Sequence, residues 1–375
     1  MREVQRRHRS MKEQRVRAGI LGATGAVGQR MVQMLDGHPW FQVTALAASD
    51  RSAGRPYSEV CRWMLPGEMP SWAATMPVQE ARPNLPCQLV FSALPGDVAG
   101  PIEANFAAAG YAVCSNASAH RQDPDIPVLI PEVNPEHLGL IPTQRAQRGW
   151  RGFLVTKPNC STTHLVTVLK PLWDAFGLRR VFIVTLQAVS GAGYPGVPSW
   201  DMVDNVVPYI RGEEEKVEWE PRKLLGRLVH GHIEEADLLL SAQCNRVPVR
   251  DGHLECVSVE LGRKAPLEEV RAALEAFRAL PQELGLPSAP ERLILLRPEA
   301  DRPQPQYDRD VGRGMSTTVG RIRPCPVLEK KNHNQDYRFV LLGHNTVRGA
   351  AGGAILSAEL LLAQGYLDDV PGGGS

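Results

Sequence analysis

Residues 157–162 read KPNCST, and the cysteine in this run, Cys160, is the most informative residue of the chain. The run follows the apolar segment Phe153–Val155 and precedes a helical pattern over Thr162–Phe176, which predicts a cysteine at a strand-to-helix junction. Unpaired backbone N–H groups and the positive end of the helix dipole favour the thiolate there. Because an ordinary cysteine has a pKa of about 8.5, a nucleophile needs this help and a nearby base. The alternative is a buried structural cysteine without chemistry.

The glycine-rich segment 16–28, VRAGILGATGAVG, predicts a second site, because an apolar strand leads into a turn with Gly22, Gly25 and Gly28. Glycines let a tight turn approach a pyrophosphate closely, and the N-terminus of the following helix faces the anion. That helix is indicated by apolar residues on one face, Val27, Met31, Met34 and Leu35. The same glycine pattern also occurs for packing alone.

The strand predicted over Phe41–Ala48 ends in a segment that would contact the ribose of a dinucleotide. Asp50 suits the 2′-hydroxyl of NAD. Arg51, flanked by Ser49 and Ser52, suits the 2′-phosphate of NADP, because guanidinium and hydroxyl groups complement a dianion. Both cofactors stay open, and we favour NADP.

An activated cysteine beside a dinucleotide indicates oxidation or reduction at the level of aldehydes and acyl groups. Such chemistry needs a base, and the candidate among ten histidines is His253. It ends the segment NRVPVRDGH, seven residues after Arg246, and an extended segment would join the two side chains. Without that context, His253 would be interpreted as a satisfied histidine at a strand end.

The composition is that of an ordinary globular protein, with 375 residues, 43% hydrophobic content, 22% charged content and a net charge of +1. This length predicts two domains, and the balanced charge gives no reason to expect nucleic acid or a membrane surface as a partner. Seven cysteines without CxxC spacing predict a reducing compartment, the cytoplasm, and neither a disulfide framework nor a metal site. The longest apolar stretches fall short of the roughly 20 residues that span a bilayer.

The first half of the chain alternates strands with helices, which predicts a Rossmann-type doubly wound parallel sheet in an α/β fold. Further strands are expected at 89–94, 111–115 and 128–130, with a helix over 102–109.

The second half changes character, because the strands predicted at 180–189 and 253–261 are long and alternate in polarity. They predict an α+β domain. We expect an extended loop over 284–310 and a loop that becomes a long helix in HNTVRGAAGGAILSAELLLAQGYL. Residues 1–15 are basic, lack the apolar core of a secretory signal and are predicted to be a disordered extension.

Six segments, in order from about residue 15 to 368, resemble aspartate-semialdehyde dehydrogenase, most closely the branch found in archaea and fungi. They read GATGAVG, KPNCSTTH, TLQAVSGAG, EEEKVEWEPRK, NRVPVRDGH and HNTVRGAAGG. The resemblance implies an NADP-binding domain over 16–158 with 345–370, and a catalytic and dimerisation domain over 159–344. It also implies a homodimer or homotetramer.

The resemblance assigns roles to five residues around the nucleophile. It makes Cys160 the acyl-thioester nucleophile and His253 the general acid/base. Asn159 would position the reacting carbonyl and stabilise its oxyanion. Gln187 would hold the substrate near the thiol, and Arg246 would bind the substrate α-carboxylate.

On the phosphate side, the resemblance implies a pocket made by Arg121 and Lys216, ordered by Glu213. Without its motif, the run EEEK would be interpreted as a solvated charged face. Asn345 would contact the nicotinamide carboxamide. The implied dinucleotide-binding residues are Gly22, Thr24, Gly25, Val27, Gly28, Ser49, Arg51, Ser52, Leu94, Pro95, Ser190, Gly191 and Asn345.

The implied reaction is the reductive dephosphorylation of L-4-aspartyl phosphate to L-aspartate 4-semialdehyde, in the biosynthesis of Lys, Met, Thr and Ile. The charges agree with it independently, because this substrate carries a carboxylate and a phosphate at opposite ends and two cationic sites would fix its orientation.

Two alternatives stay open. Malonyl-CoA reductase shares several of these segments, but its members lack the asparagine before the nucleophile and the Glu-x-x-Lys pocket. This chain has both, as Asn159 and as Glu213 with Lys216. The second alternative is a catalytically silent nucleotide-binding protein, since fold does not determine function.

Overall fold

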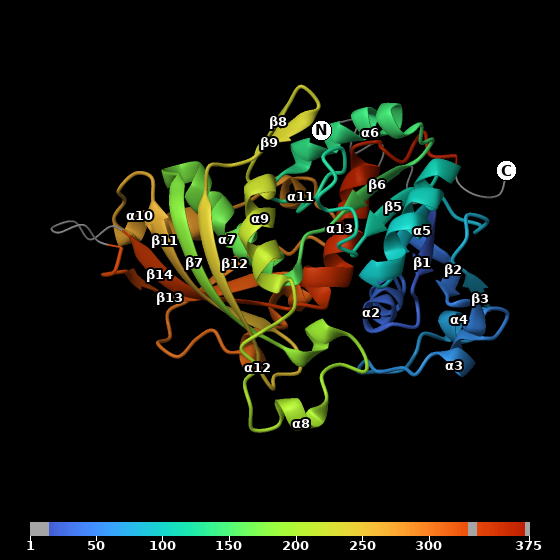
Figure 1. Ribbon diagram of the computed structural model, residues 1–375, viewed down its shortest axis with the longest axis horizontal. Coiled ribbons are helices and arrows are strands. Elements are labelled where there is room, and N and C mark those ends of the chain that lie inside the picture. The colour runs from blue at the N-terminus through green and yellow to red at the C-terminus, as the bar shows by residue number, and fades with distance from the viewer. Residues whose placement is uncertain (1–14, 329–335, 372–375) are drawn as a thin grey trace.

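The computed structural model describes residues 15–328 and 336–371, and the first half forms a six-stranded, fully parallel sheet (Figure 1). Its strand order is β3-β2-β1-β4-β5-β6, which confirms the predicted doubly wound fold. The strands are β1 Val16–Leu21, β2 Phe41–Ala48, β3 Val78–Glu80, β4 Leu89–Ser92, β5 Ala112–Ser115 and β6 Phe153–Thr156. Because the order reverses between β1 and β4, their carboxyl ends flank the crevice in which such sheets bind ligands.

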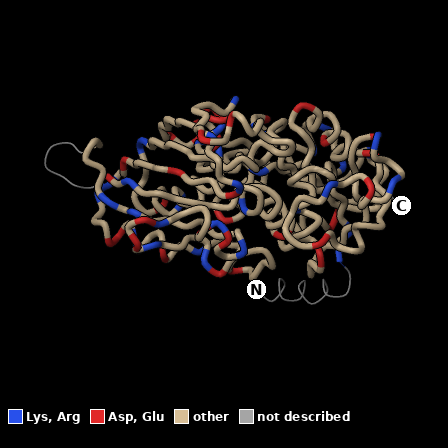
Figure 2. The backbone as a smooth tube through the Cα atoms, turned by 90° about the horizontal axis from the view of Figure 1, so that it is seen from below, with Lys and Arg blue, Asp and Glu red and all other residues tan. Residues whose placement is uncertain are grey.

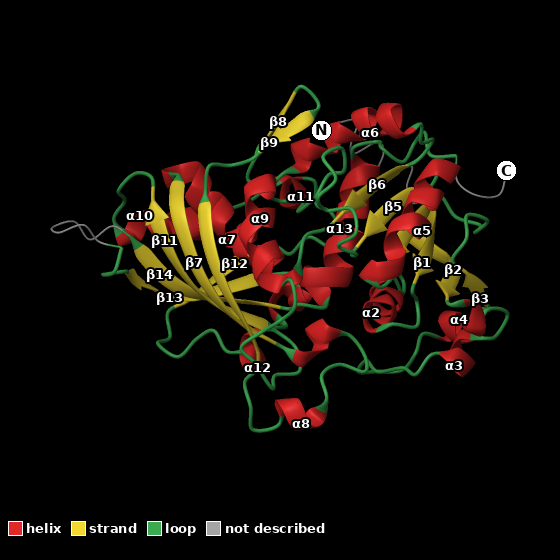
Figure 3. Ribbon diagram, in the orientation of Figure 1, coloured by secondary structure: helices red, strands yellow, loops and turns green. Residues whose placement is uncertain are grey.

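Helices cover both faces of this sheet (Figure 3). The helix predicted after the glycine turn is confirmed as α2, Ala26–Met34, with Met31 and Leu35 buried. The helix expected from residue 102 begins earlier, as α5, Gly96–Ala109. The other helices of this half are α3 Tyr57–Val60, α4 Ser71–Ala74 and α6 Ile141–Arg148.

The strand predicted at 128–130 is wrong, because Val128 forms only an isolated parallel bridge to Thr156. The side chain of Asn134 takes the place of a neighbouring strand. Its Oδ1 accepts from the N–H of Ile130 at 2.9 Å, and its Nδ2 donates to the carbonyl of Val128 at 2.8 Å.

The second half forms a mixed six-stranded sheet in the order β10-β7-β11-β14-β13-β12. Its four central strands are antiparallel, as predicted, and the outer pairs β10–β7 and β12–β13 are parallel. The strands are β7 Leu178–Gln187, β10 Leu239–Arg246, β11 His253–Leu261, β12 Ile294–Arg297, β13 Thr317–Pro324 and β14 Tyr337–Gly343. Helices α7, Cys160–Phe176, and α10, Leu267–Glu275, pack on one face, and α9, Glu213–Leu224, lies beside β10.

The prediction of an extended loop over 284–310 is wrong in part, because this segment contains β12 and the short helix α12, Pro305–Asp308. The ordering contact is the buried carboxylate of Asp308. It accepts from Arg297 Nε at 2.8 Å and from Arg302 Nε at 2.6 Å, two charge-assisted hydrogen bonds on one side chain. The remaining elements are α8 Ser199–Met202, α11 Leu280–Glu283 and the hairpin β8 Arg227–Val229 with β9 His232–Glu234.

The C-terminal segment returns to the first half of the chain. A π-helical turn over Val347–Ala351 leads into α13, Gly352–Ala363, in which every residue is buried. Helix α13 packs beside β5 and α2 (Figure 1). Just before it, the buried Arg348 donates two hydrogen bonds of 2.6 Å to the carboxylate of Glu132. This bidentate ion pair joins the C-terminal segment to the segment before β6.

Basic and acidic residues are interspersed along the chain without gathering by sign (Figure 2), in agreement with a net charge of +1. No helix within 15–328 or 336–371 is both long and apolar enough to span a membrane. The predicted N-terminal extension lies outside the described residues, apart from Arg15.

The Glu132–Arg348 pair predicts a strong stability effect. Glu132→Ala leaves the guanidinium buried without its counter-charge, so we expect a loss of about 3–5 kcal/mol in the free energy of unfolding. Urea unfolding followed by circular dichroism would measure it. The matched control is Glu59→Ala, which breaks the exposed 3.5 Å pair with Arg55 and should change stability by less than about 1 kcal/mol. Equal losses in the two variants would contradict the assignment.

Candidate active site

Cys160 is the first residue of α7, four residues after the last residue of β6 and two residues earlier than the predicted helix start. The residue before it, Asn159, caps the helix. Its Oδ1 accepts from the N–H groups of Ser161 at 2.9 Å and Thr162 at 3.3 Å. The strand-to-helix junction predicted for the cysteine is therefore confirmed, and its backbone is held by the side chain of its neighbour.

His253, the first residue of β11, contacts the cysteine directly. Its Nε2 lies 3.2 Å from Sγ of Cys160. The N–H of Ala188 donates to Nδ1 at 3.1 Å, so Nδ1 is the acceptor and a neutral ring carries its proton on Nε2. Burial, and next the charge of Arg246, hold the pKa of His253 well below its ordinary value. The ring is therefore neutral and presents an N–H to the sulfur.

Strand register places three predicted side chains in one row. The parallel pairing of β10 with β7 sets Arg246 opposite Gln187. The antiparallel pairing of β7 with β11 continues the row to His253. All three are buried, and Nη1 of Arg246 donates to the carbonyl of Ala188 at 2.9 Å. Gly191 faces this row, and a side chain there would meet Arg246 Nη1 at 2.9 Å and the His253 ring at 3.1 Å.

The expectation that the helix terminus makes Cys160 a thiolate is wrong for the free protein. Burial, and next the charge of Glu213, raise the pKa of the Cys160 thiol to about 11. Lys157, Arg246 and the N–H of Ser161 act in the opposite direction without reversing the shift. The resting site is therefore a neutral thiol beside a neutral imidazole, because desolvation outweighs the helix end.

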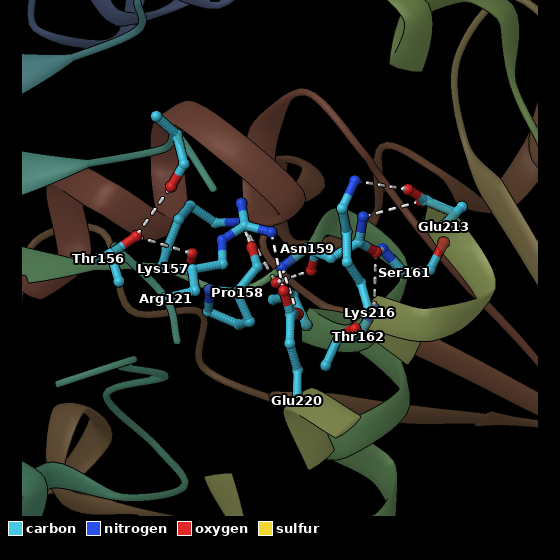
Figure 4. Close-up of polar contacts among 12 residues, drawn as sticks. Arg121, Thr156, Lys157, Pro158, Asn159, Ser161, Thr162, Glu213, Lys216 and Glu220 are labelled. Atoms are coloured by element: carbon cyan, nitrogen blue, oxygen red, sulfur yellow. Dashed lines mark hydrogen bonds and ion pairs between the residues drawn. The ribbon is translucent and has the colours of Figure 1, made fainter. Parts of the chain in front are cut away.

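Glu213, at the start of α9, contacts three of the predicted side chains, and Figure 4 labels two of them, Asn159 and Lys216. Its Oε1 accepts from Asn159 Nδ2 at 2.8 Å and from Gln187 Nε2 at 3.0 Å. Lys216, one turn later, lies 3.6 Å from the same carboxylate. The run EEEK thus reaches the site through its first and last residues.

Glu220 belongs to the site and was not predicted. It is fully buried, accepts from Arg121 Nη1 at 2.8 Å and accepts from the N–H of Asn159 at 2.7 Å (Figure 4). Its signal in the sequence is its spacing, because it follows Glu213 by seven residues, or two helical turns, and therefore shares its face of the helix. One carboxylate thus holds both the guanidinium of Arg121 and the backbone next to Cys160.

These residues line a cleft of about 550 Å³ between the two halves of the chain. Arg121, Asn159, Cys160, Gln187, Glu213, Lys216 and Arg246 line it, and so do the predicted dinucleotide residues Val27, Leu94, Pro95, Ser190, Gly191 and Asn345. The amide of Asn345 accepts from the N–H of Gly252 at 2.9 Å and donates to Ser190 at 2.8 Å, which ties the C-terminal segment to this wall.

The glycine turn fits a dinucleotide phosphate. Gly22 has φ +73°, and a side chain at Gly28 would lie 2.2 Å from the Gly22 carbonyl, so only glycine permits this turn. Helix α2 has no side-chain cap and no acidic residue in its first turn, which leaves its terminal N–H groups available to an anion. Gly22, Thr24, Gly25 and Gly28 do not line the cleft itself.

The predicted ribose segment lies at the end of β2, as expected, and outside the lining of the cleft. Asp50, Arg51 and Ser52 form a single 3-10 turn after Ser49, and Arg51 is exposed. No cluster of three or more His, Cys, Asp or Glu residues suited to a metal was found in the described segments.

Comparison with known proteins agrees with this geometry. Residues 17–141 match the family described as semialdehyde dehydrogenase, NAD binding domain, and residues 169–348 match its dimerisation domain. The aspartate-semialdehyde dehydrogenase of Methanothermobacter thermautotrophicus is 54% identical over 92% of this chain and 99% of its own. The chain belongs to the aspartate-semialdehyde dehydrogenase family.

The relatives of this semialdehyde dehydrogenase include fungal enzymes, as predicted. The Saccharomyces cerevisiae aspartate-semialdehyde dehydrogenase is 43% identical over 93% of this chain and 98% of its own. The Candida albicans enzyme, solved with NADP, superimposes with a TM-score of 0.85 at 43% identity, covering 94% of this chain and 99% of that one.

The pKa of Cys160 predicts slow alkylation at neutral pH. A pKa of about 11 leaves roughly one thiol in a thousand ionised at pH 8, so the rate with iodoacetamide should rise about tenfold per pH unit from about pH 7 to 10. Peptide mapping by mass spectrometry follows Cys160 separately from the other six cysteines, and free glutathione in the same sample reports the reagent. A plateau already reached near neutral pH would mean a thiolate–imidazolium pair instead.

Proposed function

We propose that the protein reduces L-4-aspartyl phosphate to L-aspartate 4-semialdehyde with NADPH, through a thioester on Cys160. The observation that carries the proposal is the Cys160–His253 contact of 3.2 Å inside a cleft whose walls carry cations at separate places. Membership of the family supplies the reaction class.

The sulfur of Cys160 attacks the acyl carbon, and the thiol proton leaves with the phosphate as the thioester forms. When bound, reduced NADP supplies the hydride that brings the acyl group to the aldehyde level. His253 then acts as the acid, because its Nε2–H faces the sulfur and donates a proton to it as the aldehyde is released, and the ring takes a replacement proton from water. Asn159, held by Glu213, positions the reacting carbonyl.

The cations orient the two ends of the substrate. Arg246, in the row with Gln187 and His253, binds the α-carboxylate, and Gln187 holds the substrate beside the thiol. Arg121 and Lys216 bind the phosphate. Their carboxylate partners are already in place in the free protein, so the cations reach the substrate from fixed positions.

The glycine turn after β1 would hold the pyrophosphate of NADP, and Ser49, Arg51 and Ser52 would hold its 2′-phosphate. The exposed Arg51 and the open terminus of α2 support this placement. We divide the chain into a nucleotide domain, 16–158 with 345–370, and a catalytic and dimerisation domain, 159–344. Packing of α13 against the first sheet supports the division.

Malonyl-CoA reductase is not favoured, because the relatives named above are aspartate-semialdehyde dehydrogenases and the Glu213–Lys216 pocket is present. A silent nucleotide-binding protein would not need the aligned row of Arg246, Gln187 and His253. We place the enzyme in the cytoplasm, in the pathway to Lys, Met, Thr and Ile. Its seven cysteines, all free, suit a reducing compartment.

Turnover tests the proposal directly. Aspartate semialdehyde should reduce NADP only when phosphate is present, faster than it reduces NAD, and malonyl-CoA should not oxidise NADPH. Cys160→Ala should abolish the reaction and leave NADP binding, followed by fluorescence titration, within about threefold of wild type, because the sulfur carries the thioester. Phosphate-independent turnover, or substantial activity in Cys160→Ala, would contradict the mechanism.

We propose that two copies associate through the face of the second sheet that α7 and α10 leave uncovered. A tetramer would need a second, separate surface. Helices α7 and α10 cover one face of that sheet. The other face exposes Phe182 (44%), Val184 (37%) and Leu239 (67%). A sheet face with large apolar residues on adjacent strands is typical of an interface.

Light scattering after gel filtration tests this interface. The wild type should have the mass of two or four 41.2 kDa chains, and Val184→Glu should lower the mass because it buries a charge against the partner. The control is Val98→Glu, which is 43% exposed on α5 and should keep the wild-type mass. An unchanged mass in Val184→Glu would exclude this face.

A further inference from the structure

Lys157 is a buried cation that the mechanism above does not use. It lies three residues before the nucleophile and is 5% exposed. Its Nζ donates to the carbonyl of Pro158 at 2.6 Å, to the carbonyl of Gly349 and to the hydroxyl of Thr163 at 3.3 Å. Within the described segments, no carboxylate lies within ion-pair distance of this nitrogen.

The three acceptors require the charged form of the side chain. An ammonium group has three hydrogens and donates to all three oxygens, whereas a neutral amine has two and would turn its lone pair towards the third. The geometry therefore describes the ammonium form of Lys157, which predominates below about pH 7.

A buried ammonium without a counter-charge is costly, because it loses its hydration. Burial, and next the charge of Arg121, lower the pKa of Lys157 to about 7, and Arg348 acts in the same direction. Cys160 and Glu220 are the neighbours that favour the charge. Glu220 is already bonded to Arg121 and to a backbone N–H. The sulfur of Cys160 is the other neighbour, and Arg246 is the second cation that acts on it.

Two glycines of the C-terminal segment make this arrangement possible. A side chain at Gly349 would lie 2.9 Å from Cβ of Cys160. A side chain at Gly353 would lie 3.2 Å from Cε of Lys157. The segment therefore packs against both the nucleophile and the lysine stem, and the Gly349 carbonyl, held by Nζ, joins the two contacts.

We propose that Lys157 is a positioning residue that stabilises the thiolate of Cys160, as a fixed positive charge beneath the first turn of α7 and as the tether that holds Gly349 against the nucleophile. The proposal rests on Cys160 as the nucleophile of the proposed function. Its test reads the sulfur directly, without substrate or turnover, so failure of one does not imply failure of the other.

The experiment compares the pH profile of Cys160 alkylation by iodoacetamide in wild type, Lys157→Met and Lys157→Gln. Methionine removes the charge and the donors, and glutamine removes the charge while keeping an N–H₂ group. Near pH 6.5, where most of Lys157 is charged, the rate in both variants should fall about tenfold below wild type, because loss of a nearby cation raises the thiol pKa by about one unit or more. The difference should shrink above about pH 8, because a lysine with a pKa of about 7 is mostly neutral there.

The controls separate charge from folding. Alkylation of free glutathione added to the same samples should be unchanged, and Lys170→Met, a partly exposed lysine of α7, should match wild type at Cys160. NADP titration and thermal unfolding report whether each variant is folded. A structural lysine would lower thermal stability and leave the pH profile of Cys160 in place.

Three results would overturn the proposal. Superimposed profiles for wild type and Lys157→Met would mean that the charge does not act on the sulfur. A wild-type profile in Lys157→Gln would mean that the tether alone matters. If neither variant folds, Thr163→Val keeps the lysine and removes one acceptor, so a smaller fall in rate is expected and an unchanged profile decides against the proposal.

Discussion

The active site depends on burying several charges around one helical turn while leaving each of them in a fixed place. Glu220 is the centre of this arrangement, because its two oxygens bind the guanidinium of Arg121 and the N–H of Asn159. Glu213 accepts hydrogen bonds from the side-chain amides of Asn159 and Gln187. Charged groups removed from water lose their hydration, so such an arrangement persists only when every member has directed partners. The site is therefore pre-organised, because the groups that would meet a doubly charged substrate need no rearrangement.

The sequence was enough to predict which residues meet at the site, but not their states of ionisation. Cys160 and His253 stand in short motifs, and the fold brings Nε2 of His253 to 3.2 Å from Sγ of Cys160. The ionisation of Cys160 was predicted wrongly, because the helix terminus is a local property whereas burial and the charge of Glu213 come from the tertiary structure. Glu220 was missed for the same reason. Its role depends on Arg121, which lies 99 residues away and whose proximity no local pattern indicates.

The fold followed from alternation of strands and helices, and the errors fall where side chains replace backbone partners. The apolar run at 128–130 has the composition of a strand, but the amide of Asn134 supplies its hydrogen bonds. The proline-rich segment 284–310 has no periodicity, but Asp308 binds two arginines of that segment and orders it. In both segments one polar side chain performs a task that hydrophobic patterning does not record. Patterning predicts elements that are stabilised by their apolar faces, and it fails for segments stabilised by a single polar contact.

The return of the C-terminal segment has a consequence for the order of events during synthesis on the ribosome. Helix α13 fills the core of the first sheet, and Gly349 forms the wall beside Cys160, yet both emerge long after β6 and Cys160. Domains generally fold as they leave the ribosome, N-terminal parts first. Here the nascent nucleotide-binding sheet would wait with an open apolar face, and Cys160 would stay outside any finished cleft. The thiol is thus enclosed only after residues 349–363 have been made.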